Sequence, residues 1–207
     1  MIIDLHTHTT GESVCSELTL EELVQRARQL GVEAACLTEH NKTWDRDILK
    51  EVSRAYNFPL FSGVEVKTNH GHILVFGLRE YNPDFWRAEK LRRAVDEQGG
   101  VMIAAHPIRA VSRKLSVSQL AERPLFHLVD DIETCNGASS KDENDIASQV
   151  CRLLNYTGVG GSDAHMINEV GRCVTVFERI IETEEQLIIE LKAKRFKSAQ
   201  FYQGATG

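Results

Sequence analysis

The sequence predicts an α/β protein in which short buried strands alternate with amphipathic helices. Apolar, strand-like runs recur along the whole chain, and segments with the apolar spacing of a helix separate most of them. Most of these apolar runs also end on histidine or carboxylate side chains. Alternating strands and helices build parallel sheets whose carboxyl ends carry functional side chains, so we expect one sheet with a site at that edge.

A closed barrel explains this pattern better than an open sheet. Ligands of an open doubly wound sheet gather at one switch point between neighbouring strands, whereas at least five strand ends here carry candidate side chains. Only closure of the sheet would bring that many ends together. We recognise about seven strands, fewer than the usual eight of a TIM barrel, and therefore expect a distorted, TIM-like seven-stranded β/α barrel.

The first strand opens the chain with Met-Ile-Ile-Asp-Leu-His-Thr-His. Asp4, His6 and His8 share one face of it, because alternate side chains of a strand point the same way. Two imidazoles at this spacing can bind one metal ion, although a lone His-x-His is more often part of a surface turn. After a loop, Thr19 is expected to begin a helix that ends at Gly31.

The following elements repeat the order of strand and helix. The expected strand at 32–38 is almost wholly apolar, which is typical of a parallel strand covered on both faces. Strand 60–66 leads through a turn at 69–71 into a strand that begins at His72, and we expect these two strands to pair antiparallel. The other expected elements before the irregular segment 107–124 are a helix at 44–56, a helix at 83–98 and a strand at 101–105.

The second half is expected to continue the alternation to the end of the chain. Its predicted elements are strand 128–132, a helix at about 143–155, strands 158–161 and 174–177, and a capped helix at 183–194. No linker or repeat interrupts them. A length of 207 residues suits a single domain, so we expect residues 1–207 to form one.

Composition limits the partners that the protein can have. With 42% hydrophobic and 26% charged residues, the chain is typical of globular proteins. A net charge of -6 gives no basic field for long duplex nucleic acid. We find no signal-like segment or run of membrane-spanning length, so we expect a cytoplasmic protein without a membrane partner. Five cysteines without a Cys-x-x-Cys pair argue against a disulfide framework, and we expect Cys36 and Cys151, within apolar segments, to be buried free thiols.

The candidate ligands are metal-capable side chains at predicted strand ends. They are His6, His8, His40, Glu65, His72, His106, Asp163 and His165. Singly, each has a plain structural explanation: His106 could be a loop residue, Asp163 a helix cap and Glu65 a solvated charge. Together they favour a metal site, because chemistry gathers at the carboxyl ends of barrel strands. Arg109 and Arg172 follow two of these ends and could bind phosphate or form surface ion pairs.

Five motifs, in this order along the chain, resemble the PHP (polymerase and histidinol phosphatase) family. They are Asp4-Leu5-His6-Thr7-His8, Thr38-Glu39-His40-Asn41, Gly63-Val64-Glu65, Ala105-His106-Pro107 and Gly161-Ser162-Asp163-Ala164-His165. The resemblance covers essentially the whole chain. It implies a single PHP domain with the family's distorted seven-stranded β/α barrel, usually three divalent metals, and hydrolysis of phosphoesters.

The resemblance also implies how the ligands are divided. By position, His6, His8, Glu65 and Asp163 would hold one ion, Glu65 with His72 and His106 a second, and His40 with His165 a third. The family usually completes the third site with an aspartate or histidine, where Cys15 stands here. We therefore expect two or three divalent ions of zinc, manganese or iron.

Clustered divalent ions suit phosphoester hydrolysis, because they acidify a bridging water and neutralise charge on the phosphoryl oxygens. We expect a metal-dependent phosphatase or phosphodiesterase that attacks a small phosphorylated metabolite or nucleotide with a metal-bridging hydroxide. Glu65, Asp163, Arg109 and Arg172 would serve catalysis. The alternatives are a nuclease for short oligonucleotides, a non-catalytic metal-binding PHP module, and an amide or ring hydrolase, which usually relies on a carboxylated lysine.

Overall fold

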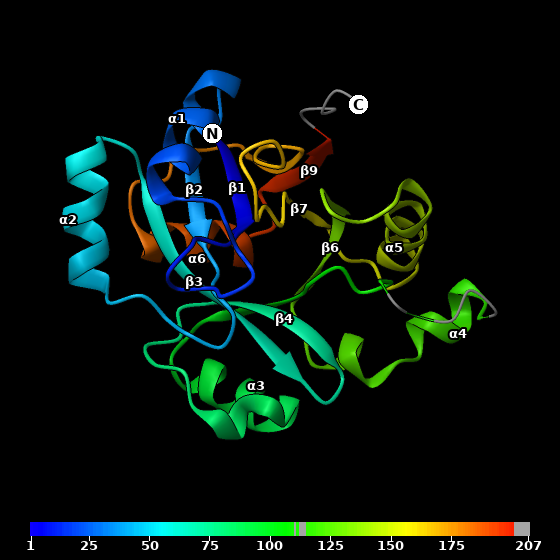
Figure 1. Cartoon of the computed structure of the whole chain (residues 1–207). Helices are drawn as coiled ribbons and strands as arrows, with labels where there is room; N and C mark the ends of the chain where they lie inside the picture. Colours follow the sequence, from blue (N-terminus) through cyan, green and yellow to red (C-terminus); the bar gives the residue numbers. More distant parts are fainter. Residues whose placement is uncertain (110, 112–114, 201–207) are drawn as a thin grey trace.

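The computed structural model describes residues 1–109, 111 and 115–200. These residues form an α/β fold around one sheet of nine strands, which are paired partly parallel and partly antiparallel. The strands follow the order β7-β6-β5-β4-β3-β2-β1-β8-β9 (Figure 1). They are β1 (Ile2–Thr7), β2 (Ala34–Leu37), β3 (Leu60–Thr68), β4 (Gly71–Phe76), β5 (Val101–Ala104), β6 (Asp131–Asn136), β7 (Val159–Gly161), β8 (Cys173–Phe177) and β9 (Phe196–Gln200).

The sheet is nearly closed into a barrel, because β7 at one end of the order returns to β1 and β8. Asp163 N donates to His6 O at 2.7 Å, and His8 N donates to Ala164 O at 3.0 Å. On the other side, Gly160 N donates to Thr175 Oγ1 at 2.9 Å. A Cβ at Gly160 would lie 2.3 Å from Val174 O, so only glycine permits this approach of β7 to β8. The predicted distorted barrel is thus present, with β7 completing it.

The expected count of about seven strands is too low for this sheet, which contains a strand at each of the eight expected ranges and one further strand, β9. The final strand β9 was missed because Phe-Lys-Ser-Ala-Gln carries little apolar signal and pairs only with β8, antiparallel. Two runs of parallel strands, β1-β2-β3 and β5-β6-β7, are separated by β4, which is antiparallel to both of its neighbours. The antiparallel pairing of β3 with β4 is confirmed.

The helices lie around the sheet and are mostly where the sequence predicts them. They are α1 (Leu20–Leu30), α2 (Arg46–Tyr56), α3 (Ala88–Glu97), α4 (Val117–Ala121), α5 (Lys141–Leu153) and α6 (Glu184–Lys192), with 3-10 turns at Pro83–Trp86 and Pro124–His127. The capping box of Thr19 and Glu22 is present at the start of α1. The helix expected at 83–98 is divided at Arg87, whose extended backbone ends the 3-10 turn before α3 begins.

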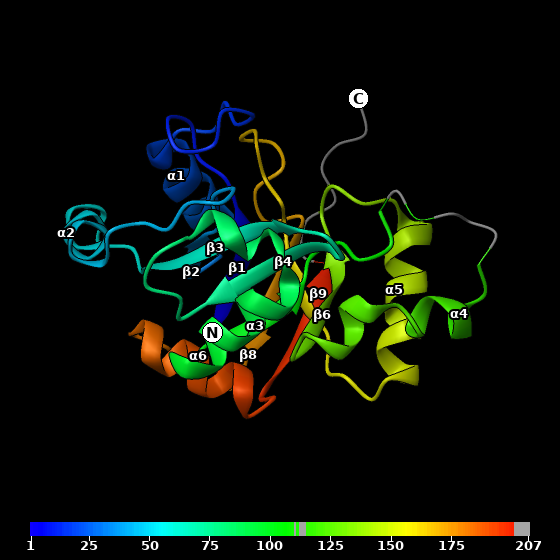
Figure 2. The same cartoon turned by 90° about the horizontal axis from the view of Figure 1, so that it is seen from below.

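One apolar cluster fills the barrel between its strands. It includes Ile3, Leu74, Phe76 and Ile103, and Leu187 of α6 packs against it. Figure 2 shows α2 at one side of the sheet and α4 and α5 at the opposite side. The polar residues of β1, Asp4, His6 and Thr7, are also buried but do not belong to this apolar cluster. His6 and Thr7 form the carboxyl end of the strand.

The cysteines differ in part from the prediction. Cys135 of β6 and Cys173 of β8 form a disulfide with Cα atoms 5.7 Å apart, although no disulfide was expected. Spacing along the sequence does not reveal such pairs, because it cannot say which strands the fold brings together. Cys36 and Cys151 are free and buried, as expected. In the described part of the chain, no helix has the length and apolar character needed to cross a membrane.

Candidate metal centre

His6 and His8 project from the end of β1 into the carboxyl side of the barrel. Both side chains are fully buried, and their Nε2 atoms lie 3.1 Å apart. This arrangement follows from the strand itself, since residues two apart share a face. Two imidazole nitrogens this close cannot both present lone pairs to each other without a proton or a cation between them.

Two carboxylates complete the surroundings of these nitrogens. Asp163 Oδ1 lies 3.3 Å from His6 Nε2 and 3.4 Å from His8 Nε2. Glu65 Oε2 lies 3.6 Å and 3.4 Å from the same two atoms. Ligands about 2.0–2.1 Å from a tetrahedral ion are separated by roughly 3.3–3.4 Å, and the distances from each imidazole nitrogen to the other nitrogen and to the two carboxylates are close to this value. The residues present therefore fit one divalent ion.

Glu65 lies within β3 and is the central carboxylate of the cluster. Its Oε1 accepts from His72 Nδ1 at 2.7 Å and from His106 Nε2 at 2.9 Å. Its Oε2 is buried and lies 2.8 Å from His40 Nδ1, yet no donor is aligned to form a hydrogen bond with it. A buried carboxylate oxygen without a donor is costly unless a cation is present, and the two oxygens of Glu65 could bridge two ions.

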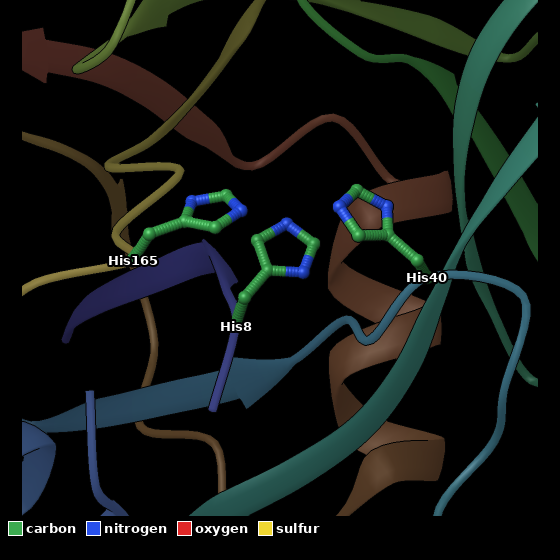
Figure 3. Close-up of side chains that lie close together, drawn as sticks. All are labelled: His8, His40 and His165. Atoms are coloured by element: carbon green, nitrogen blue, oxygen red, sulfur yellow. The ribbon is translucent and has the colours of Figure 1, made fainter. Parts of the chain in front are cut away.

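A third group consists of imidazoles only. His8, His40 and His165 present ring nitrogens within 4.8 Å of one another, from the ends of three different strand segments (Figure 3). The rings of His8 and His40 are stacked with centroids 4.3 Å apart. Cys15 does not belong to any of the groups found among the described residues, and its side chain is exposed.

Two of these residues have a positive φ, a backbone conformation that residues other than glycine rarely adopt. His106 has φ 29° and Asp163 has φ 55°. Both conformations are held by hydrogen bonds, from His106 N to Glu133 Oε2 and from Asp163 N to His6 O, each 2.7 Å long. Such strained positions gather at functional sites, because the surrounding structure fixes them in order to aim a side chain.

Burial and charge set the protonation of the cluster. Burial opposes the charged form of His6, but Asp163, Glu133 and Glu65 outweigh it and raise the pKa of His6 well above 6.5. Burial likewise opposes the charged form of Glu65, while the neighbouring imidazoles of His6, His106 and His40 lower the pKa of Glu65 well below 4.5. The pKa of Asp163 is lowered in the same way, chiefly by His6 and His8 against the effect of burial. The metal-free centre thus holds two carboxylates around a protonated imidazole.

The two predicted arginines lie at the edge of the cluster. Arg109 Nη2 donates to Asp163 Oδ2 at 2.8 Å, to Asn136 Oδ1 at 2.6 Å and to Ser139 Oγ at 3.3 Å. Arg172 is half-buried, and its Nη1 lies 4.0 Å from Glu169 Oε1. Arg109 is therefore bound to one of the candidate ligands, whereas the carboxylate nearest to Arg172 among the described residues is the more distant Glu169.

Sequence reasoning missed three polar residues that surround the candidate ligands. Glu133 Oε1 accepts from His6 Nδ1 at 3.1 Å, and Asn136 Nδ2 donates to Glu133 Oε2 at 2.9 Å. Ser13 Oγ lies 3.3 Å from His8 Nδ1. A carboxylate directly after the strand expected at 128–132 was a usable signal for Glu133, whereas the loop position of Ser13 gave none. His70 is not part of the cluster and pairs with Glu89 at 3.0 Å, whereas His72 contacts Glu65.

Comparison with family models and with a curated protein gives matches along most of the chain. A model described as PHP domain matches residues 4–138, and one described as PHP-associated matches residues 141–196. An uncharacterized protein of Methanocaldococcus jannaschii is 27% identical over 124 residues, which cover 56% of this chain and 72% of that protein.

Solved structures with a similar fold include PsfC from Pseudomonas syringae, with a TM-score of 0.69, 18% identity, and coverage of 98% of this chain and 92% of that chain. A candidate metal-dependent phosphoesterase from Bifidobacterium adolescentis has a TM-score of 0.61 and 18% identity, over 79% and 87% of the two chains. Endonuclease Q in complex with a 27-mer duplex bearing an abasic lesion has a TM-score of 0.56 and 17% identity, over 93% and 57%. At these identities the likeness shows the fold.

Proposed function

The chain belongs to the PHP domain family, and from this premise we propose that it is a metal-dependent phosphoesterase for a small phosphorylated metabolite or nucleotide. The observation that carries the proposal is that both Glu65 and Asp163 place a carboxylate oxygen 3.3–3.6 Å from the Nε2 atoms of His6 and His8. We further propose that residues 1–207 act as a single PHP domain, and a cytoplasmic location stays a prediction.

The proposed ligands divide into the three groups expected from the family. His6, His8, Glu65 and Asp163 would hold the first ion, Glu65 with His72 and His106 the second, and His40 with His165 and Cys15 the third. Zinc, manganese and iron all accept such histidine and carboxylate sets. Divalent ions held there would lower the pKa of a water molecule and neutralise charge on phosphoryl oxygens.

The substrate would approach from the solvent side of the cluster. The side chains of His40, His72 and Arg109 are 33%, 32% and 34% exposed, whereas those of His6, His8 and Glu65 are buried. Arg109 Nη2 is engaged with Asp163 and Asn136, and since no described residue accepts from its Nη1, this nitrogen could donate to a phosphoryl oxygen. Arg172 is the second proposed phosphate contact, since a planar guanidinium matches two phosphate oxygens.

A second candidate is a nuclease for short oligonucleotides. It is favoured by the open side of the cluster and by the likeness of fold to Endonuclease Q, whose structure holds a duplex with an abasic lesion. The net charge of -6 favours a small substrate over a long polyanion. A non-catalytic module is the third candidate, and the complete set of His6, His8, Glu65 and Asp163 speaks against it.

The deciding experiment is metal analysis of protein purified without chelator, combined with a screen of phosphomonoesters, phosphodiesters and short oligonucleotides. We expect two or three bound ions per chain and hydrolysis of at least one phosphomonoester or phosphodiester. A protein without bound metal, or a fully loaded protein that hydrolyses none of these classes, would overturn the proposal.

The variant Glu65→Gln tests the central carboxylate. The amide has nearly the same shape but offers only one acceptor oxygen, so it cannot bridge two ions. We expect metal content to fall by at least one ion and activity to fall by at least about a hundredfold. Glu89→Gln, on the surface beside His70, is the matched control and should keep both. Near-normal activity of Glu65→Gln would exclude a bridging role.

A further inference from the structure

We propose that two buried carboxylates, Glu133 and Glu39, are positioning residues that orient the imidazoles of His6 and His8 toward one metal ion. The proposal rests on the metal centre proposed above. Neither carboxylate is among the expected ligands, and each acts on a ligand through the ring nitrogen that faces away from the cluster.

Glu133 acts on His6 directly. Its Oε1 lies 3.1 Å from His6 Nδ1, and both side chains are completely buried. An ionised carboxylate only accepts hydrogen bonds, so Nδ1 must carry the proton and Nε2 is the nitrogen left for a cation. The other oxygen of Glu133 accepts from His106 N at 2.7 Å and from Asn136 Nδ2 at 2.9 Å. These two donors prevent the carboxylate from rotating away from His6.

Glu39 acts on His8 through Ser13. The hydroxyl of Ser13 makes a short hydrogen bond to Glu39 Oε2, and its oxygen lies 3.3 Å from His8 Nδ1. Since the hydroxyl donates to the carboxylate, it must accept from His8 Nδ1, which again leaves Nε2 for a cation. Thr9 fixes the same carboxylate with its backbone N at 3.1 Å and its Oγ1 at 2.5 Å. These hydrogen bonds connect Ser13, in the loop after β1, to His8.

Charge supports a role toward metal rather than a purely structural one. Glu39 and Glu133 are buried, and among the described residues no lysine or arginine is ion-paired with either of them. A buried carboxylate is costly unless a cation lies beside it, and for Glu133 the imidazole of His6 is the group that could carry this charge when no metal is bound. Together with Glu65 and Asp163 they place four carboxylates around the cluster. Two divalent ions would balance this charge, and the hydrogen-bonded carboxylates would increase the basicity of both imidazoles.

The test for the first arm is Glu133→Gln, measured by zinc competition against a chromophoric chelator. Glutamine keeps the size of the side chain but has only one acceptor oxygen. If that oxygen accepts from His106 N and Asn136 Nδ2, the NH₂ group faces His6 Nδ1, and His6 loses its fixed orientation. We expect zinc affinity to weaken by about tenfold to a hundredfold. The matched control is Asp131→Asn, which alters another buried carboxylate of β6. Asp131 binds Lys194 Nζ at 2.8 Å and contacts none of the proposed metal ligands. The control should lose stability and keep zinc affinity.

The test for the second arm is Ser13→Ala, which removes the link to His8 while Glu39 keeps its bonds to Thr9. We expect zinc affinity to weaken by roughly tenfold. Its control is Ser53→Ala on α2, whose hydroxyl accepts from Leu60 N at 2.7 Å outside the centre. The absorption spectrum of the cobalt-loaded protein provides a second measurement, since a changed ligand orientation alters its bands. Both variants should change the spectrum, and both controls should not.

Denaturant unfolding of each metal-free variant separates positioning from general damage. Glu133→Gln and Ser13→Ala should lose more zinc affinity than their controls at equal loss of stability. Unchanged zinc affinity and cobalt spectrum in both variants would overturn the positioning role while leaving the metal centre intact. If the unaltered protein binds neither zinc nor cobalt, the proposed function itself fails, and the positioning role fails with it.

Discussion

His6 is the residue whose protonation state must change when a metal ion is bound. Burial opposes its charged form, but Asp163, Glu133 and Glu65 keep the pKa of His6 well above 6.5, so the metal-free protein holds an imidazolium at neutral pH. A metal ligand must be deprotonated, and binding therefore displaces this proton. The proton and the metal are alternative ways of neutralising the same carboxylates.

Zinc binding at pH 7 should consequently release close to one proton from His6. Calorimetry in two buffers with different ionisation enthalpies measures this number, and His6→Asn should abolish most of it. Because the pKa of His6 is raised in the folded state, its charge stabilises the metal-free protein below about pH 6.5, and this stability is lost as pH rises through the raised pKa. The same heat of binding in both buffers would contradict this account.

Cys15 is the residue at which this chain departs from its family's expected ligands. It lies exposed on the loop after β1, and burial together with the charges of Glu65 and Asp163 raises the pKa of its thiol. A metal would have to displace that proton, and a thiolate favours zinc or iron(II) over manganese or magnesium. Its role as the third ligand beside His40 and His165 therefore stays a proposal.

Cys15→Ser should lower the metal content by up to one ion per chain, and Cys15→Asp should shift the preference from zinc toward manganese. Metal analysis after loading with each ion measures both effects. Cys151→Ser, at a buried free thiol of α5, is the control and should leave the content unchanged. Identical stoichiometry and metal preference in all the Cys15 variants would show that the thiol is not a ligand.

At the level of elements, β1 positions more of the centre than any other strand. It carries His6 and leads directly into His8, and the barrel closes where β1 meets the chain beyond β7 through His6 O and Ala164 O. Its alternation is visible in the sequence, which is why the strand and the common face of these two histidines were predicted correctly. The strained backbone of His106 and Asp163 was not, because it depends on bonds to Glu133 and His6 from distant parts of the chain.

The boundaries of β6 show the same limit of sequence reasoning. The strand was expected at 128–132, but it runs from Asp131 to Asn136, since Pro124–His127 forms a 3-10 turn and Leu128 continues it. This shift left Glu133 and Asn136 outside the expected strand. Polar residues in a buried strand depress its apolar signal, and here they are the ones that contact His6 and Arg109.

The disulfide between Cys135 of β6 and Cys173 of β8 should stabilise the barrel across β7. It joins residues 38 apart in sequence, and a loop of this length predicts a contribution of about 3 to 4 kcal/mol through the unfolded state. Cys135→Ser combined with Cys173→Ser should lower the free energy of unfolding by about this amount. Denaturant titration measures it, with Cys36 and Cys151 left in place.

Zinc affinity of the double variant is the control for the centre. Cys135 precedes Asn136 but contributes no atom to the candidate ligand groups, so affinity should change by less than about threefold. Unchanged stability of the double variant, or of the protein after mild reduction, would show that the pair does not hold β6 and β8 together.

At the scale of the whole molecule, sheet closure explains why residues from distant segments meet. Ends of β1, β2, β3, β5 and β7 are brought to one side of the barrel, and the histidine and carboxylate side chains predicted as ligands lie there together, whereas Cys15 does not join them. The apolar runs that end on histidines are local signals, and they were enough to predict this gathering. The number of strands and the disulfide depend on pairing between distant strands, which a single sequence does not encode locally.

The overall charge of -6 determines how substrates of different length should respond to salt. A protein that binds long nucleic acid through cationic contacts loses affinity steeply as salt rises, whereas an acidic protein repels a long polyanion and screening relieves the repulsion. For oligonucleotides, kcat/KM should therefore stay level or rise between about 50 and 200 mM salt, with little change for a mononucleotide. A steep fall with salt that grows with oligonucleotide length would instead identify a local cationic surface and favour the nuclease over the small-molecule phosphoesterase.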